Sequence, residues 1–237
     1  YVNNSLTSAT FGNNIRLRIV DFRNCAKYAQ APDLSGCTNV EEVYFNGTAI
    51  TGISLPNGGG VKILHLPGTV ANLTLRNLTA LIEFVMPSYS NVTTLRLENV
   101  SNVVNSVDIV LAMAAGSRVR LINVDWNLET ADVIDKLNTM RGMTETGENT
   151  SIAVVSGKAH FASIAISTYL IAKERYPYLS ITADKYELDV LEVSSSQIFI
   201  TSDNKLFMLA DGGHSTDYTG AEIDQYISDH ITYNEEE

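Results

Sequence analysis

The chain has 237 residues, of which 45% are apolar, and a formal net charge of −11. This length and composition predict one elongated folded domain, or one domain with a small appendage. The longest apolar runs stay well below 18 residues, which excludes a membrane-spanning helix. The acidic balance makes nucleic acid an unsuitable partner, because phosphate backbones would be repelled.

The negative charge is concentrated in the second part of the chain. Residues 1–100 hold seven Lys and Arg against six Asp and Glu, whereas residues 101–237 hold nine against 21. No Lys or Arg follows Lys205, and the sequence ends in three glutamates. We interpret this end as a solubilising acidic segment. Because the sequence begins with Tyr1 and no charged-then-apolar leader follows, we expect a processed or excised piece of a longer chain.

The N-terminal region, which precedes a repeated pattern, contains a polar segment and the two cysteines of the chain. Residues 1–14 are polar and rich in Asn, Ser and Thr, which predicts an entry segment or cap. Two cysteines follow, Cys25 and Cys37, each after a turn-like pair of residues. A compact thiol suits a buried corner at such a position, so we favour buried free thiols over a disulfide. A metal site would need more ligands than this region offers.

Residues 40–99 repeat one six-residue pattern six times, in the form apolar, any, any, apolar, any, apolar. The copies read VEEVYF, ITGISL, VKILHL, VANLTL, LIEFVM and VTTLRL, and residues 17–22, LRIVDF, give it once more. Successive copies in 40–99 start 9 to 11 residues apart, so one full turn takes about 21 residues and carries two copies. Self-similarity at this period predicts stacked turns that pair only with their neighbours.

The two rows of copies differ in the residues that follow them. After the second copy of each turn comes an asparagine at a constant offset: Asn57, Asn77 and Asn99. Stacked asparagine side chains can donate to and accept from turn backbone that no strand reaches. We therefore predict a structural asparagine ladder that points inward.

The outward residues of the rows are the candidates for binding. In each copy the last two apolar residues lie two apart, so the residue between them faces outward from an extended segment. On the first row, these outward residues form a candidate contact face: Asp21, Tyr44, His65, Val85 and Asn123. The second row presents Ser54, Thr74 and Arg96. The alternative is a solvated strand face that needs no ligand.

The pattern changes after residue 99. Spacing predicts helices over 107–116 and over 130–142, the second with Thr130 as N-cap and Gly142 as its stop. A strand at 152–155, a helix over 161–175 and a strand at 176–182 predict a parallel crossover. The end predicts a hairpin of 198–200 with 206–209 through a turn at 202–205, and a short helix over 219–231.

The sequence lacks the common motifs of metal-binding, phosphate-binding and hydrolytic sites. The four histidines lie in unrelated contexts, without His-x-x-x-His or Cys-x-x-Cys spacing. The run S-G-K at 156–158 lacks the upstream glycine of a phosphate-binding loop, and no G-x-S-x-G is present. We predict no enzyme, no catalytic residue, no metal and no cofactor.

Residues 33–59, DLSGCTNVEEVYFNGTAITGISLPNGG, resemble leucine-rich repeats, and more narrowly a divergent type found in structural proteins of gut bacteriophages and in surface proteins of their bacterial hosts. Residues 120–128, 155–161 and 176–184 resemble the closing part of those phage proteins. The resemblance covers about residues 17–184. It implies a leucine-rich-repeat-like right-handed solenoid, an α/β repeat with two short strands per ~21-residue turn.

The resemblance also implies an organisation and a function. After the entry segment 1–14, the solenoid would occupy 15–184, with two-strand turns to about 100 and helix-backed turns over 101–184. Residues 185–237 would form a small acidic segment of hairpin plus helix. The function implied is a non-enzymatic, tail-associated virion component that mediates assembly or host-surface contact. The alternative is a bacterial cell-surface or secreted adhesin that binds protein or glycan.

These functions carry expectations about partners and location. Partners would be other virion or surface proteins, a host glycan, or further copies of the chain, with neither nucleic acid nor a membrane span involved. The location would be the virion or the extracellular space, or alternatively the bacterial cell surface.

Overall fold

The computed structural model describes residues 5–144, 148–149, 152–188, 192–193, 196–200, 206–209 and 216–218. The chain divides into two compact units. The first comprises residues 1–124 and 136–155, and the second comprises residues 125–135 and 156–237. The predicted turn at 202–205 and the predicted helix over 219–231 lie outside the described residues.

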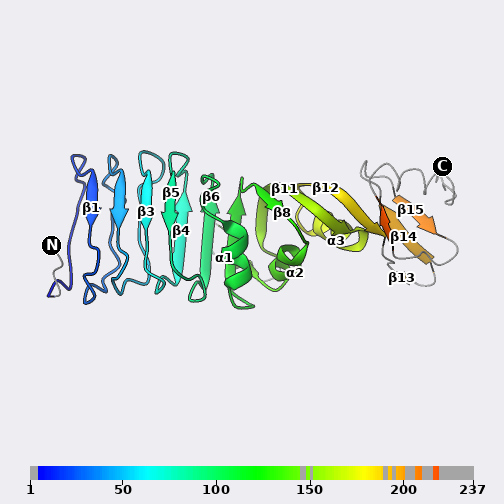
Figure 1. The fold of residues 1–237 in the computed structure, drawn as a ribbon, viewed down its shortest axis with the longest axis horizontal. Helices are drawn as coiled ribbons and strands as arrows, with labels where there is room; N and C mark the ends of the chain where they lie inside the picture. Colours follow the sequence, from blue (N-terminus) through cyan, green and yellow to red (C-terminus); the bar gives the residue numbers. More distant parts are fainter. Residues whose placement is uncertain are drawn as a thin grey trace. The chain divides into compact units, whose positions relative to one another are not determined.

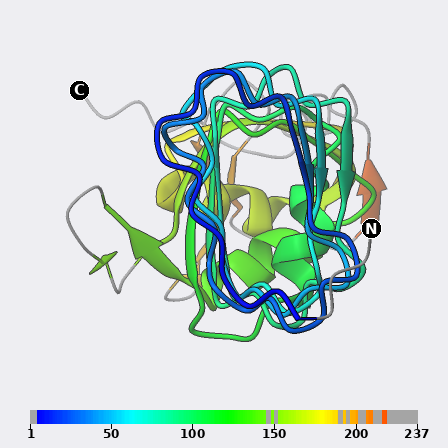
Figure 2. The same cartoon turned by 90° about the vertical axis from the view of Figure 1, so that its left-hand side faces the viewer.

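The first unit begins with a parallel sheet that takes one strand from each of four successive turns (Figure 1). Its strands, in spatial order, are β1 (Ile19–Asp21), β2 (Glu42–Tyr44), β3 (Ile63–His65) and β5 (Glu83–Val85). Their register places Val20, Val43, Leu64 and Phe84 in one line. Seen along the stack, the turns of this part of the chain lie over one another (Figure 2).

Much of the core of the first unit consists of the apolar positions of the repeated pattern. Val40, Val43 and Phe45 of one turn and their counterparts in the next turns, such as Leu64 and Leu66, are fully buried. Burial of each such side chain contributes ~1.5–3 kcal/mol. A cluster of four rings packs among the first turns: Phe11, Phe22, Tyr28 and Phe45. Cys25 and Cys37 are buried free thiols, as favoured from the sequence.

The second row forms regular strands only from residue 72 onward. Here β4 (Asn72–Arg76), β6 (Thr94–Glu98) and β7 (Arg118–Ile122) pair in parallel. Strand β9 (Arg141–Met143) pairs in parallel with β7, and β10 (Glu148–Asn149) pairs antiparallel with β9. In the earlier turns this row holds only two isolated bridges, Asp33 with Ser54 and Gly52 with Asn72.

The expectation of a leucine-rich-repeat-like right-handed solenoid with two short strands per turn is therefore wrong. The copy at residues 50–55 keeps Ile50 and Ile53 buried, but it does not form a strand. Gly52 within it and Pro56 after it explain the difference, because glycine weakens a strand and proline lacks the N–H that a ladder needs. The fold is instead of an α/β type, built from parallel-strand sheets with three short helices among the described residues.

The helices are shorter than the spacing predicted. Helix α1 (Ser106–Ala112) begins after Asn105, whose side chain accepts from the N–H of Asp108 and caps the first turn. Helix α2 (Asp132–Asn138) has only seven residues. The predicted stop, Gly142, lies instead within β9, because the chain turns directly from the helix into a strand. The expectation of helix-backed turns over 101–184 is corrected together with the fold, because the described residues of this range form only short helices.

The second unit contains a parallel crossover. The long strand β11 (Val154–Ala165) enters it from Ser156 onward, pairs in parallel with β8 (Trp126–Leu128), and continues through α3 (Ile166–Arg175) into β12 (Tyr178–Leu188). Strands β11 and β12 are parallel, as predicted. The predicted helix over 161–175 begins five residues late, because Phe161 is buried as part of β11 and pairs with Leu128.

The remaining described strands of the second unit are short. Strand β16 (Thr216–Tyr218) pairs antiparallel with the end of β12. A three-stranded antiparallel sheet is formed by β13 (Glu192–Val193), β14 (Ser196–Ile200) and β15 (Leu206–Leu209). The pairing of Ile198 with Met208 confirms the predicted hairpin partners.

Candidate contact face of the first strand row

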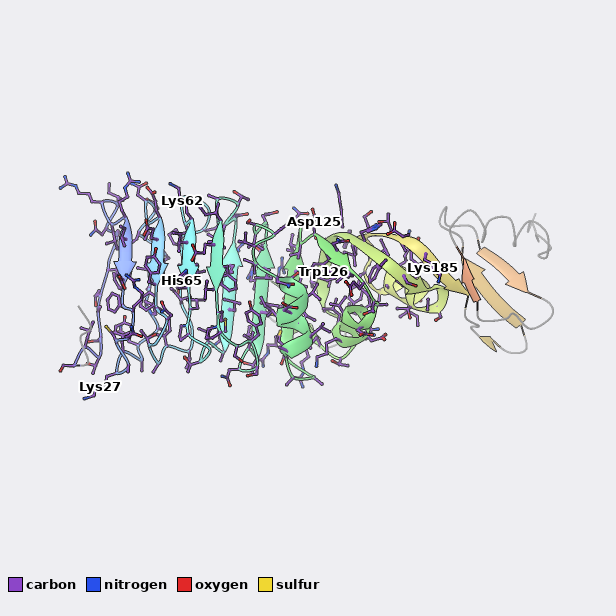
Figure 3. The ribbon with its side chains drawn as sticks, in the orientation of Figure 1. Lys27, Lys62, His65, Asp125, Trp126 and Lys185 are labelled. Carbon is purple, nitrogen blue, oxygen red and sulfur yellow. The ribbon has the colours of Figure 1, made fainter. Side chains whose placement is uncertain are left out.

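Four of the five predicted contact residues lie side by side on the first sheet. The register pairs Asp21 with Tyr44, Tyr44 with His65, and His65 with Val85. Each follows a residue that points into the stack, such as Val43 or Leu64, and therefore faces outward. Figure 3 labels His65 on this part of the stack.

Close contacts join these side chains across the turns. The guanidinium carbon of Arg23 lies 4.9 Å from the centre of the Tyr44 ring, a cation–π distance. The Tyr44 and His65 rings meet edge to face, with centroids 5.0 Å apart and an interplanar angle of 84°. His65 Nε2 lies 2.6 Å from Glu83 Oε1. The contact face is thus a continuous row over four turns.

Hydrogen bonds hold the row in position. The Tyr44 hydroxyl donates to Glu42 Oε2 at 2.9 Å, and this bond, with a smaller effect from burial, raises the pKa of Tyr44. Arg23 Nε donates to Asp21 Oδ1 at 2.9 Å, and this hydrogen bond lowers the pKa of the Asp21 carboxyl group. Asp21 and Arg23, like Glu42 and Tyr44, are thus linked to each other on this face.

Three members of this row were missed from the sequence: Arg23, Glu42 and Glu83. Glu42 and Glu83 occupy the first position of their strands, two residues before Tyr44 and Val85, and so share the outward face. Period-two spacing could have identified them. Arg23 lies beyond its strand, and its contact with Tyr44 depends on the neighbouring turn.

The fifth predicted contact residue, Asn123, lies elsewhere. Its Nδ2 donates to Asn99 Oδ1 at 2.7 Å. Asn123 therefore belongs to the line of asparagines that follows the strands of the second row, which we call the asparagine row. Asn99 in turn donates to Asn77 at 2.7 Å, and Asn77 to Asn57 at 2.8 Å. Asn123 is placed there because it directly follows β7, as Asn77 and Asn99 follow β4 and β6.

The geometry of this asparagine row explains why asparagine recurs. Asn77, Asn99 and Asn123 all have a positive φ, between 49° and 54°. Asparagine tolerates this left-handed conformation better than most residues, and its amide can both donate and accept. The row is exposed or half-buried at the strand ends and does not point into the core, which corrects the expected inward direction.

Replacing Asn77 with alanine should lower the free energy of unfolding by about 2 kcal/mol, from lost amide hydrogen bonds and the cost of alanine at positive φ. Asn77→Gly also loses the hydrogen bonds but adopts this φ freely, and it should cost less. Urea denaturation of both variants measures the difference. If neither variant shifts the unfolding midpoint, the asparagine row does not stabilise the fold.

A buried charge cluster lies on the second strand row. The Glu98 side chain is 8% exposed and accepts from the Nε atoms of three arginines. These are Arg96 at 2.7 Å, Arg76 at 2.8 Å and Arg120 at 2.9 Å. Burial alone would raise the pKa of Glu98, but hydrogen bonds from Arg96 and Arg76 outweigh it and lower the pKa. This cluster joins side chains from three neighbouring strands, β4, β6 and β7.

A polar group on the second unit has the composition of a hydrolytic triad. His160 Nδ1 lies 3.0 Å from Thr182 Oγ1, and His160 Nε2 lies 3.3 Å from Asp184 Oδ2. The Asp184 side chain is 74% exposed, whereas the carboxylate that orients such a histidine is buried. We therefore assign no catalytic residue. In the described ranges, no group of three or more His, Cys, Asp or Glu side chains could hold a metal ion.

Comparison with known proteins places the chain in no family. No protein-family model matches the sequence, and neither a curated protein nor a solved structure matches it. Among the helices that the structure describes, none is long and apolar enough to cross a membrane.

Proposed function

We propose that the protein is a non-enzymatic structural and binding protein, a tail-associated component of a bacteriophage virion that contacts a host surface or other virion proteins. The observation that carries the binding role is the ordered contact face from Arg23 through Tyr44 and His65 to Glu83. The resemblance of residues 33–59 to repeats of gut-phage structural proteins supports the phage assignment.

The composition of the contact face favours a polar macromolecular surface as its partner. Tyrosine and arginine are enriched at the centres of protein interfaces, because each combines large contact area with directed hydrogen bonds. Here Arg23 and Tyr44 are already packed on each other at the outer surface. Strand faces from successive turns also present the extended area that large partners need.

A Tyr44→Ala, His65→Ala double variant should remain folded and lose at least tenfold in binding. Both side chains lie on the outer face and not in the core, so their removal leaves the buried apolar positions intact. Binding is measured by flow cytometry with labelled protein on a panel of intact gut bacteria. A matched control is Tyr178→Ala, His160→Ala, which removes the same residue types from exposed positions on the second unit and should bind normally.

Two outcomes would count against this proposal. Unchanged binding by the Tyr44→Ala, His65→Ala variant would remove the contact face from consideration. Antibodies raised against the chain address the location: labelling of phage particles supports a virion component. Labelling of the bacterial cell surface without labelling of particles would instead favour the adhesin.

A further inference from the structure

A hollow of about 490 Å³ lies on the second strand row, away from the contact face. Its walls include Gly52, Ser54, Asn57, Asn72, Thr74 and Arg76. This volume lies within the range of ~300–1,000 Å³ that small-ligand sites occupy. The hollow is therefore large enough to hold a sugar or a molecule of similar size.

The hollow exists because small residues occupy outward positions where later turns carry long side chains. Gly52 pairs with Asn72 in a parallel bridge, and an outward side chain is missing at this glycine. In the next turn, Thr74 is the register partner of Arg96, whose long side chain lies against Glu98. The surface is thus hollowed beside β4 and filled at β6.

Polar side chains without protein partners converge on this hollow. Within the part of the chain that the structure describes, the hydroxyls of Ser54 and Thr74 and the amide of Asn72 make no hydrogen bond to protein. Asn57, which also lines the hollow, accepts from Asn77 through its Oδ1, and no hydrogen bond from its side-chain amide nitrogen is found among the described residues. The site therefore offers both donors and acceptors.

We propose that this hollow binds a neutral saccharide. Sugar hydroxyls both donate and accept, which matches a wall of hydroxyl and amide groups. Among the lining residues only Arg76 is charged, and its Nε is paired with the Glu98 carboxylate at 2.8 Å. Exposed Ala31 and half-buried Leu55, which also line the hollow, provide apolar surface for the C–H face of a sugar ring. This site goes beyond the proposed function and does not depend on the contact face.

The geometry at Gly52 supplies a direct test. A Cβ atom built there would lie 3.6 Å from the Asn72 carbonyl oxygen and 3.7 Å from Asn72 Cβ, which are ordinary contacts. Gly52→Leu should therefore fold and fill the hollow. Gly60→Leu is the matched control, because a Cβ there also meets atoms no closer than 3.7 Å and Gly60 does not line the hollow.

The full chain is titrated with maltohexaose, mannohexaose, galactohexaose and chitohexaose, together with one sialylated and one sulfated oligosaccharide, by isothermal calorimetry. We expect binding of at least one neutral oligosaccharide, weakened at least tenfold in Gly52→Leu and unchanged in Gly60→Leu. The Tyr44→Ala, His65→Ala variant should also bind normally, which separates this site from the contact face. Thr74→Val removes one hydroxyl while keeping the shape of the side chain, and it should weaken binding several-fold. It tests the proposal if Gly52→Leu does not fold.

The proposal is overturned if no neutral oligosaccharide binds, or if only the sialylated or sulfated one does. Equal binding by wild type and a folded Gly52→Leu variant would place the sugar elsewhere. Loss of binding in Gly60→Leu would show that the effect is not local to the hollow.

Discussion

Replacing Glu98 with glutamine should lower the free energy of unfolding by roughly 3 kcal/mol or more, which is the cost of removing one partner of a buried ion pair. Glutamine keeps the shape of the side chain but removes the charge that Arg76, Arg96 and Arg120 share. The Arg96 and Arg120 side chains are each only 13% exposed, so water compensates little for the lost carboxylate. Urea denaturation at pH 7 measures the loss.

The matched control is Glu83→Gln. Its carboxylate is also paired, with His65, but the Glu83 side chain is 50% exposed. An exposed pair of this kind contributes at most ~1 kcal/mol, so this variant should stay within about 1 kcal/mol of wild type. A Glu98→Gln variant as stable as Glu83→Gln would show that the arginine cluster does not stabilise the fold.

Because the pKa of Glu98 is shifted in the folded state, the stabilisation that Glu98 provides should depend on pH. This pKa is lowered in the folded state below the ordinary value of 4.5. The unfolded state therefore binds the proton more readily, and the stabilisation is fully present above the unfolded pKa. It is lost as the pH falls through the folded pKa. Between pH 7 and pH 3, wild type should lose more stability than Glu98→Gln does.

Replacing Gly142 with alanine should destabilise the first unit by about 3 kcal/mol, at the upper end of the usual cost of overpacking. An added Cβ would lie 1.4 Å from the carbonyl oxygen of Ile152 and 2.6 Å from its carbonyl carbon. Both atoms belong to the backbone, so a change of side-chain rotamer cannot relieve the overlap. Strand β9 must shift, although Gly142 is the register partner of Val119.

Gly52→Ala provides the comparison for this substitution. Its added Cβ makes only ordinary contacts, so the free energy of unfolding should change by less than about 0.5 kcal/mol. Chemical denaturation of both variants under the same conditions tests the difference. Equal stability of the two variants would contradict the close approach of Gly142 to Ile152.

The repeated pattern predicts the first strand row well. Val43 and Leu64 are buried and in register, because the same apolar spacing recurs in every turn. The second row is predicted less well, since Gly52 and Pro56 interrupt one copy without removing its apolar residues. Strand β11 is missed at Ala159, where pairing with Trp126 of a distant segment outweighs a weak local pattern.

Contacts between neighbouring turns also limited the prediction of the candidate site from the sequence. Tyr44 and His65 lie 21 positions apart in the sequence, and the turn length places them side by side. The burial of Glu98 could not be predicted, because it depends on arginines from the turns before and after it. The hollow depends on Gly52, and it forms only where the neighbouring turn places Asn72 beside this glycine.

The repeated contacts of the asparagine row would allow further turns to be added to the stack. Asn77 and Asn99 make the same contact as Asn99 and Asn123, and β4–β6 and β6–β7 repeat the same parallel register. A duplicated turn of this region would therefore find matching partners on both sides and would add about 4.8 Å, the spacing of neighbouring strands. Such a molecule can be lengthened in evolution or by design in whole turns, without a new core or a new kind of turn.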